Sequence, residues 1–162
     1  MGLSVRKEVL QLDFPYRKSP RIAGYNYTAP NYYFVTICTH EKKCIFGTPG
    51  RLSPMGRCAG ENLLTIPQVY PGVRIDKYVV MPNHIHAIIV IDGGAADLCT
   101  VIGQYKMSVT KRIRETAPGQ MVWQRSFHDH VIRNQAGYEK IWLYIDGNPL
   151  KWEDDCFYVA EQ

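Results

Sequence analysis

Stretches of β-branched and aromatic residues, separated by turn residues, predict a series of strands along this chain. Residues 32–39, which read YYFVTICT, form the first stretch. Residues 73–80 and 84–91 form two more, and the short Met-Pro-Asn segment between them predicts a tight antiparallel pair. Residues 121–133 predict another strand with polar interruptions. A mainly antiparallel sheet is therefore expected.

Helical patterns occupy the segments between these strands. Ser53 is typical of a helix N-cap, and Pro54 suits the first helical position. From Asp97 onward apolar residues recur at spacings of three and four, which predicts a second helix ended by Pro-Gly at 118–119. Residues 138–145 predict a third helix, stopped by the Asn-Pro pair that follows.

The order of these elements predicts the fold class. Strand, helix, strand, strand, helix, strand, helix indicates an α+β protein with helices packed on one face of an antiparallel sheet, in a ferredoxin-like or RRM-like topology. Residues 1–30 are basic and rich in turn residues, and we expect them to form an N-terminal arm. Residues 31–162 are expected to form a single domain.

Composition narrows the class of protein further. The 162 residues are 46% hydrophobic and 21% charged, which excludes extended disorder for most of the chain. The five cysteines are dispersed without a CxxC pair, which argues against a disulfide scaffold or a thiolate zinc site. The lack of a long apolar run predicts a cytoplasmic protein. The net charge of +4 permits a phosphate-rich partner without requiring one.

The segment MPNHIH, residues 81–86, is the sharpest chemical feature. Because side chains alternate along a strand, His84 and His86 should project from one face while Ile85 projects from the other. Two imidazoles side by side form a pair of metal ligands. The alternative is that they cap the sheet through hydrogen bonds, and the spacing favours metal binding. A third ligand has to come from elsewhere in the chain.

A second feature is the segment YIDGNP, residues 144–149. Tyr144 and Asn148 are four residues apart and would share a helix face. With 11 tyrosines in the chain, a core or surface role for Tyr144 is equally consistent with composition. Asn before Pro is also a common signal for the end of a helix. The residues of this segment leave both interpretations open.

In this order the motifs resemble those of the REP-associated tyrosine transposases, single-tyrosine enzymes within the HUH endonuclease superfamily. The His-hydrophobic-His strand and the YIDGNP segment are the strongest points of the resemblance. It extends from about residue 20 to residue 155 through five further segments, at 24–27, 33–38, 102–106, 123–125 and 130–133. The resemblance implies the HUH endonuclease form of the α+β fold.

The resemblance also implies an activity, that of a metal-dependent single-stranded DNA endonuclease and strand transferase. His84 and His86 would hold Mg²⁺ or Mn²⁺, with Asn148 as a third ligand through its amide oxygen. Tyr144 would be the nucleophile and would form a 5′-phosphotyrosine. Tyr138 is the rival nucleophile. We prefer Tyr144 because the match to the family's Tyr-Ile-x-x-Asn-Pro motif, with its Asn four residues later, belongs to Tyr144, whereas Trp142, four residues after Tyr138, cannot bind metal.

The implied partner is single-stranded DNA that carries a palindromic repeat hairpin, and a monomer is expected. Basic and aromatic residues then become candidates for phosphate contacts and base stacking. The candidates are Arg21, Tyr25, Lys106, Lys111, Arg112, Trp123, Arg125, His130 and Arg133. For His128 and His130 a DNA-facing or hydrogen-bonding role is preferred to metal binding. His130 fits the family pattern, and His128 is expected to be incidental.

Two other classes of function compete with this one. A non-catalytic nucleic-acid-binding module on an RRM-like sheet would explain the basic and aromatic residues without a nucleophile. A metallohydrolase of small phosphoesters would explain the histidine pair, but it leaves the resemblance along the rest of the chain without a cause.

Overall fold

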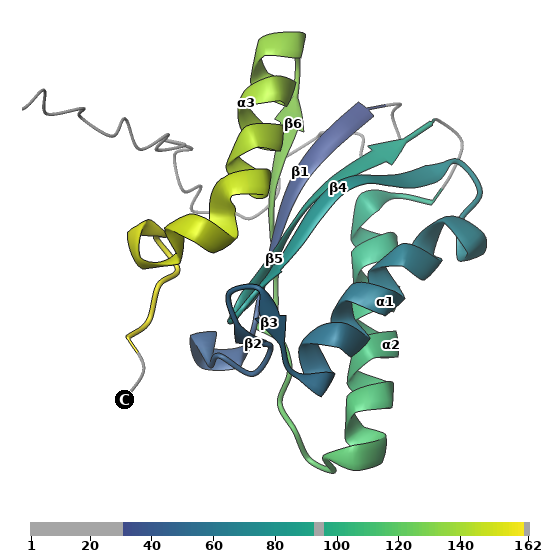
Figure 1. Ribbon diagram of the computed structural model, residues 1–162. Helices are drawn as coiled ribbons and strands as arrows, with labels where there is room; N and C mark the ends of the chain where they lie inside the picture. Colours follow the sequence, from purple (N-terminus) through teal and green to yellow (C-terminus); the bar gives the residue numbers. More distant parts are fainter. Residues whose placement is uncertain (1–30, 93–95, 161–162) are drawn as a thin grey trace, which may run out of the picture.

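A four-stranded antiparallel sheet forms the centre of the protein (Figure 1). The computed structural model describes residues 31–92 and 96–160. The sheet has the strand order β4-β5-β1-β6. The strands are β1 (Asn31–Cys38), β4 (Val73–Met81), β5 (His84–Ile91) and β6 (His128–Ile132). This is the ferredoxin-like arrangement, so the predicted α+β class is confirmed.

Two helices, α1 (Pro54–Val69) and α2 (Leu98–Thr116), cover one face of the sheet (Figure 1). Both begin where the sequence predicts. The Ser53 hydroxyl accepts a hydrogen bond from Gly56 N at 3.1 Å, and Asp97 Oδ1 accepts one from Thr100 N at 3.0 Å. None of the helices in the described part of the chain combines the length and apolarity needed to cross a membrane.

The third helix, α3 (Gln135–Gly147), lies on the opposite face of the sheet (Figure 1). It begins earlier than predicted, because Asn134 caps it by accepting a hydrogen bond from Gly137 N at 2.8 Å. A short 3-10 segment, η2 (Asn148–Asp154), follows directly. A separate apolar cluster holds α3 on the sheet, made of Phe34, Ile88, Ile132, Ile141 and Ile145. The expected packing on one face thus applies to α1 and α2, and α3 defines a second layer.

The predicted strand over residues 121–133 is too long, since only β6 within it is a strand in the sheet. The preceding residues are tied to α2 instead. The Lys106 ammonium donates to the carbonyls of Gln124 and Ser126, and the Trp123 indole N–H donates to Lys106 O at 3.1 Å. Trp123 keeps one isolated bridge to Thr39.

Short elements connect β1 to α1. A 3-10 turn, η1 (His40–Lys42), follows β1, and β2 (Gly47–Thr48) and β3 (Arg51–Leu52) then form a small hairpin. Gly47 has φ 108°, in the region that favours glycine, and a Cβ there would meet Arg51 O at an impossible distance. The predicted N-terminal arm, with Arg21 and Tyr25, lies outside the described residues.

Candidate active site

The histidine pair lies at the start of β5, on the face of the sheet that α3 covers. Strand alternation places His84 and His86 on the same side, and their side chains are almost fully buried, with 0% and 1% of the residue exposed. Their Nε2 atoms are 3.0 Å apart. The predicted side-by-side arrangement is therefore present.

The other ring nitrogens are held by neighbouring side chains. His84 Nδ1 lies 2.8 Å from Asn83 Oδ1, and His86 Nδ1 lies 2.8 Å from the Thr36 hydroxyl. Two Nε2 lone pairs at their separation would repel each other, so either a shared proton or a cation has to lie between them. Imidazoles whose outer nitrogens are hydrogen-bonded are typical of metal ligands.

Tyr144 and Asn148 reach the same place from the end of α3. The Tyr144 hydroxyl is 3.4 Å from His86 Nε2. Asn148 is 3% exposed, and its Oδ1 has no hydrogen-bond partner. An unpaired buried carbonyl oxygen is costly, and a cation would satisfy it. The donor set of two imidazole nitrogens and one amide oxygen fits a divalent cation such as Mn²⁺.

Asp155 is a residue of this site that the sequence analysis missed. Its Oδ2 accepts a hydrogen bond from Asn148 Nδ2 at 2.8 Å and lies 3.5 Å from the Tyr144 hydroxyl. The same oxygen is 3.8 Å from His84 Nε2, with both side chains 0% exposed. Ligand atoms of His84, His86 and Asp155 all lie within 4.8 Å of one another. Asp155 follows η2 in a stretch without periodic pattern, so no sequence signal singles it out.

Burial sets the protonation of the histidine pair. It lowers the pKa of His84 to about 3, although the Asn148 side chain acts in the opposite direction. Burial also lowers the pKa of His86 well below its usual range, and His84 lowers it further. Both imidazoles are therefore neutral at physiological pH, which is the form that binds a metal ion.

The same environment keeps the Tyr144 hydroxyl protonated. Burial raises the pKa of Tyr144 above its ordinary value, and the negative charge of Asp155 raises it further. A phenol in this state is a weak nucleophile. The site therefore needs positive charge near this oxygen before it can attack.

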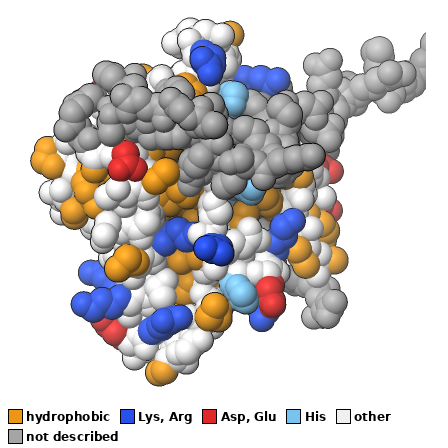
Figure 2. Space-filling model, turned by 180° about the vertical axis from the view of Figure 1, so that it is seen from behind, with side chains coloured by type: hydrophobic (Ala, Val, Ile, Leu, Met, Phe, Trp, Pro, Cys, Tyr) orange, Lys and Arg blue, Asp and Glu red, His pale blue; other side chains and the backbone are white. Residues whose placement is uncertain are grey.

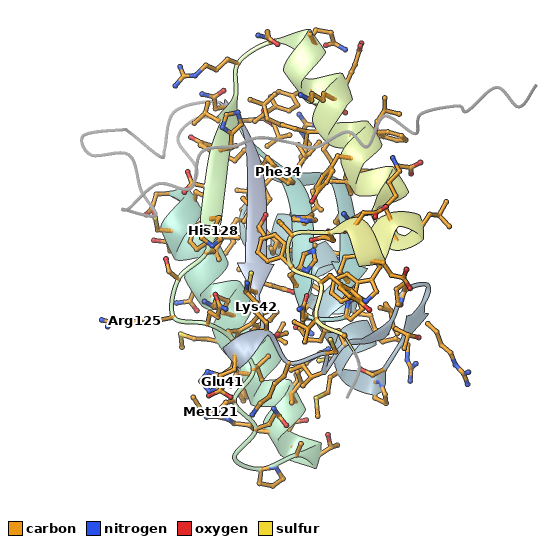
Figure 3. All side chains as sticks on the ribbon, turned by 90° about the vertical axis from the view of Figure 1, so that its left-hand side faces the viewer. Phe34, Glu41, Lys42, Met121, Arg125 and His128 are labelled. Atoms are coloured by element: carbon orange, nitrogen blue, oxygen red, sulfur yellow. The ribbon has the colours of Figure 1, made fainter. Side chains whose placement is uncertain are left out.

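Aromatic side chains surround the site. The Phe34 ring, on β1, lies 5.2 Å from the His86 ring and 6.2 Å from the Tyr144 ring, measured between centroids (Figure 3). Phe157, from the segment after η2, lies 4.7 Å from the His84 ring. Its backbone N–H donates to Asp155 Oδ1 at 2.8 Å. The histidine pair is thus enclosed between β1, α3 and the chain that follows η2.

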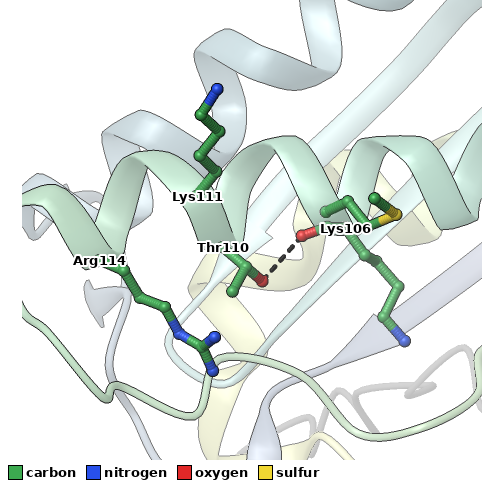
Figure 4. Close-up of a pocket in the computed structure, with 5 residues that line it drawn as sticks. Lys106, Thr110, Lys111 and Arg114 are labelled. Atoms are coloured by element: carbon green, nitrogen blue, oxygen red, sulfur yellow. Dashed lines mark hydrogen bonds between the residues drawn. The ribbon is translucent and has the colours of Figure 1, made fainter.

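The predicted DNA-binding residues fall into two groups. Lys106, Lys111 and Arg112 belong to α2, on the face of the sheet opposite the histidine pair. Together with Met107, Thr110 and Arg114, the two lysines line an open groove of about 330 Å³ on α2 (Figure 4). The surface view shows Lys and Arg side chains interspersed with uncharged ones (Figure 2).

The second group lies on or beside β6. His128 pairs with Thr36 and His130 with Phe34, which places both imidazoles on the same sheet face as the histidine pair. Arg125 and Arg133 are exposed near the two ends of this strand, and Figure 3 shows Arg125 extending outward.

Trp123 has a different environment from the other candidates. Its ring packs against Phe46 and Tyr105, with centroids 5.4 Å and 5.8 Å away. These contacts are those of a core aromatic side chain. This packing favours a structural role for Trp123.

Comparison with curated proteins finds two with similar sequences. No protein-family model matches the chain. An uncharacterised protein of Haemophilus influenzae is 33% identical over 169 residues, which cover 89% of this chain and 94% of that protein. The REP-associated tyrosine transposase of Escherichia coli is 31% identical over 78 residues, which cover 48% of this chain and 45% of that protein.

Two solved structures share the fold. One is a REP-associated tyrosine transposase bound to a REP hairpin, with a TM-score of 0.60 and 21% identity, covering 78% of this chain and 71% of that one. The other is a putative transposase from Deinococcus radiodurans, with a TM-score of 0.50 and 16% identity, covering 78% of this chain and 95% of that one.

The chain is an α+β protein with the fold of these two solved transposases, and about half of it is similar in sequence to the REP-associated tyrosine transposase of Escherichia coli. The chain belongs to one family with the Haemophilus influenzae protein, which it matches over nearly its whole length. The resemblance to the REP-associated tyrosine transposases that the motifs indicate is confirmed, by sequence over 48% of the chain and by fold over 78%.

Proposed function

We propose that the protein is a metal-dependent single-stranded DNA endonuclease and strand transferase with Tyr144 as its nucleophile. The observation that carries this proposal is the convergence of the Tyr144 hydroxyl, two neutral imidazoles and the unpaired Asn148 Oδ1 at one buried place. The similarity of the chain to tyrosine transposases supports the same conclusion.

His84, His86 and Asn148 would hold the cation, Mg²⁺ or Mn²⁺. A cation held by these residues would supply positive charge, which polarises the scissile phosphate and offsets developing negative charge. Asn148 Nδ2 donates to Asp155 Oδ2, and this bond fixes the amide so that Oδ1 is its free end. Asp155 thereby orients Asn148.

Tyr144 performs the covalent step. Its phenolic oxygen attacks phosphorus, and the bond from phosphorus to the 3′-oxygen breaks. The phenolic proton passes to Asp155 Oδ2, to which the hydroxyl donates at 3.5 Å, and Asp155 then gives this proton to the departing 3′-oxygen. The product is a 5′-phosphotyrosine, which conserves the phosphodiester energy. A 3′-hydroxyl can then reverse the step and join strands.

The proposed substrate is single-stranded DNA next to a hairpin. The β6 residues His128 and His130 lie on the nucleophile's side of the sheet, where a single strand would approach the site. The α2 groove, with Lys111 and Arg114, lies on the other side and is suited to backbone phosphates of a duplex stem. A relative of the same fold was solved bound to a REP hairpin.

The test is an adduct assay on hairpin-bearing single-stranded DNA with Mn²⁺. We expect a protein–DNA adduct that survives SDS, and its loss in Tyr144→Phe. Tyr138→Phe is the matched control, because the Tyr138 hydroxyl is bonded to Asp76 on β4 and not to the histidine pair. Adduct loss in Tyr138→Phe alone would falsify the assignment. DNA binding without any adduct under Mg²⁺ or Mn²⁺ would identify a non-catalytic binding module.

A further inference from the structure

Asn83 has an unusual position for a turn residue. It lies between β4 and β5, where turn residues are normally exposed, yet it is 0% exposed. Its Nδ2 donates to Lys42 O at 3.2 Å and to Phe157 O at 2.8 Å. Backbone carbonyls only accept hydrogen bonds, so this end of the side chain has to be the NH₂ group. The other end is therefore the amide oxygen.

The orientation of the Asn83 carboxamide determines which ring nitrogen of His84 carries the hydrogen. The amide oxygen, Oδ1, lies 2.8 Å from His84 Nδ1. Since an amide oxygen cannot donate, His84 Nδ1 has to carry the hydrogen. In a neutral imidazole the other nitrogen then carries a lone pair. That nitrogen is Nε2, the atom directed at His86.

The tautomer of His86 is not determined by its hydrogen-bond partner. His86 Nδ1 faces the Thr36 hydroxyl at 2.8 Å, and a hydroxyl both donates and accepts. Without a cation, His86 Nε2–H can donate to the His84 Nε2 lone pair at 3.0 Å while the Thr36 hydroxyl donates to His86 Nδ1. With a cation on Nε2, the hydrogen sits on His86 Nδ1 and is donated to Thr36 Oγ1. The change moves one proton within His86 and releases none.

We propose that Asn83 is a positioning residue that locks His84 as a lone-pair donor, and that His86 is the imidazole that changes tautomer when a divalent cation binds. The inference rests on the proposed metal role of the two histidines. The two histidines differ because their partners differ. His84 faces the Asn83 carboxamide, which two backbone carbonyls hold in one orientation, whereas His86 faces the Thr36 hydroxyl, which can rotate.

The test is ¹⁵N NMR of the imidazole nitrogens in the full-length protein at pH 8, with and without diamagnetic Mg²⁺. We expect His84 to carry its hydrogen on Nδ1 in both states. His86 should carry it on Nε2 without the cation and on Nδ1 with it. A metal-free protein with hydrogen on His84 Nε2 would overturn the role of Asn83. The expected metal-free tautomers with no response to Mg²⁺ would overturn the switch at His86. The adduct assay with Mn²⁺ tests the proposed function separately, so the two failures are distinguishable.

A pair of variants separates positioning from plain stability. Asn83→Ala and Asn62→Ala each remove a buried asparagine, and Asn62 lies on α1, bonded to Cys58 O and the Ser108 hydroxyl. Both should lower the free energy of unfolding. Only Asn83→Ala should give mixed His84 tautomers and weaken Mn²⁺ binding, by about 10- to 100-fold. Equal Mn²⁺ affinity in the two variants would contradict the proposal.

Discussion

At the scale of single residues, the site contains a buried polar atom without a hydrogen-bond partner. That atom is Asn148 Oδ1, whereas the His84 and His86 Nε2 atoms, 3.0 Å apart, share a hydrogen bond. The unpaired oxygen costs free energy in the metal-free protein, and a bound cation would remove that cost. Stability should therefore respond strongly to metal.

Asn148→Ala tests this coupling. At a Mn²⁺ concentration 100 times the dissociation constant, the wild-type protein should gain about 2.7 kcal/mol of unfolding free energy. A tenfold loss of affinity in the variant would reduce the gain at the same concentration to about 1.4 kcal/mol. Urea denaturation with Mn²⁺ and with EDTA measures both gains. An undiminished gain in the variant would remove Asn148 from the ligand set.

The metal-free protein should lose stability in acid because of the histidine pair. The folded-state pKa of His84, about 3, lies below the model-peptide value of 6.5, and that of His86 is also lowered. Below pH 6.5 the unfolded chain therefore binds more protons than the folded chain. The free energy of unfolding is highest above pH 6.5 and decreases as the pH falls below that value. Urea unfolding in EDTA at pH 8, 6 and 5 follows this loss. The double variant His84→Gln, His86→Gln should show a flatter profile, and an equally steep one would assign the acid sensitivity to other groups.

At the scale of elements, the docking of α3 on β1 and β5 decides whether the site is assembled. The strands supply Thr36, His84 and His86, whereas α3 and the residues after it supply Tyr144 and Asn148. A small apolar cluster that includes Ile141 connects the two parts. A substitution that weakens the packing of this cluster should therefore reduce the activity of the site more than an equally destabilising substitution elsewhere in the core.

Ile141→Val and Ile102→Val form a matched pair for this prediction. Both isoleucines are buried, at 1% and 0% exposure, one on α3 and one on α2. Each change should cost about 0.5–1.5 kcal/mol of unfolding free energy. We expect only Ile141→Val to slow adduct formation, since it alone loosens the helix that carries Tyr144. Equal adduct rates in the two variants would show that α3 docking does not limit the site.

At the scale of the whole molecule, the sheet separates two surfaces with different proposed tasks. The candidate active site lies on the α3 face, and the α2 groove lies on the other. Recognition of a hairpin stem and cleavage of its flanking strand would then occur on opposite sides of the sheet. Charge changes in the groove should affect binding of the stem without altering the chemistry.

Lys111→Glu is expected to weaken binding of the hairpin and to reduce the dependence of its affinity on salt, because a phosphate contact is lost. Adduct formation on a short strand without a hairpin should be unchanged. Arg51→Glu, an exposed change of the same charge on β3, serves as the control. Fluorescence anisotropy at several salt concentrations measures the effect. If both variants weaken hairpin binding equally, the groove has no specific role.

The sequence by itself determined the elements and most of the site. Alternating and helical periods, with Ser53 as a cap, predict the strands and helices because these signals are local. The resemblance to a known family pointed to Tyr144, and strand alternation placed the two histidines side by side.

Only the tertiary structure decided which distant groups meet. It placed α3 on the face opposite α1 and α2, shortened the last strand through the contacts of Lys106, and brought Asp155 to Asn148. It also enclosed Asn83 so that its carboxamide has one possible orientation. Apart from the contact between Asp155 and Asn148, these contacts join residues 18 or more positions apart. No local pattern encodes them, because their partners are selected by packing of the whole fold.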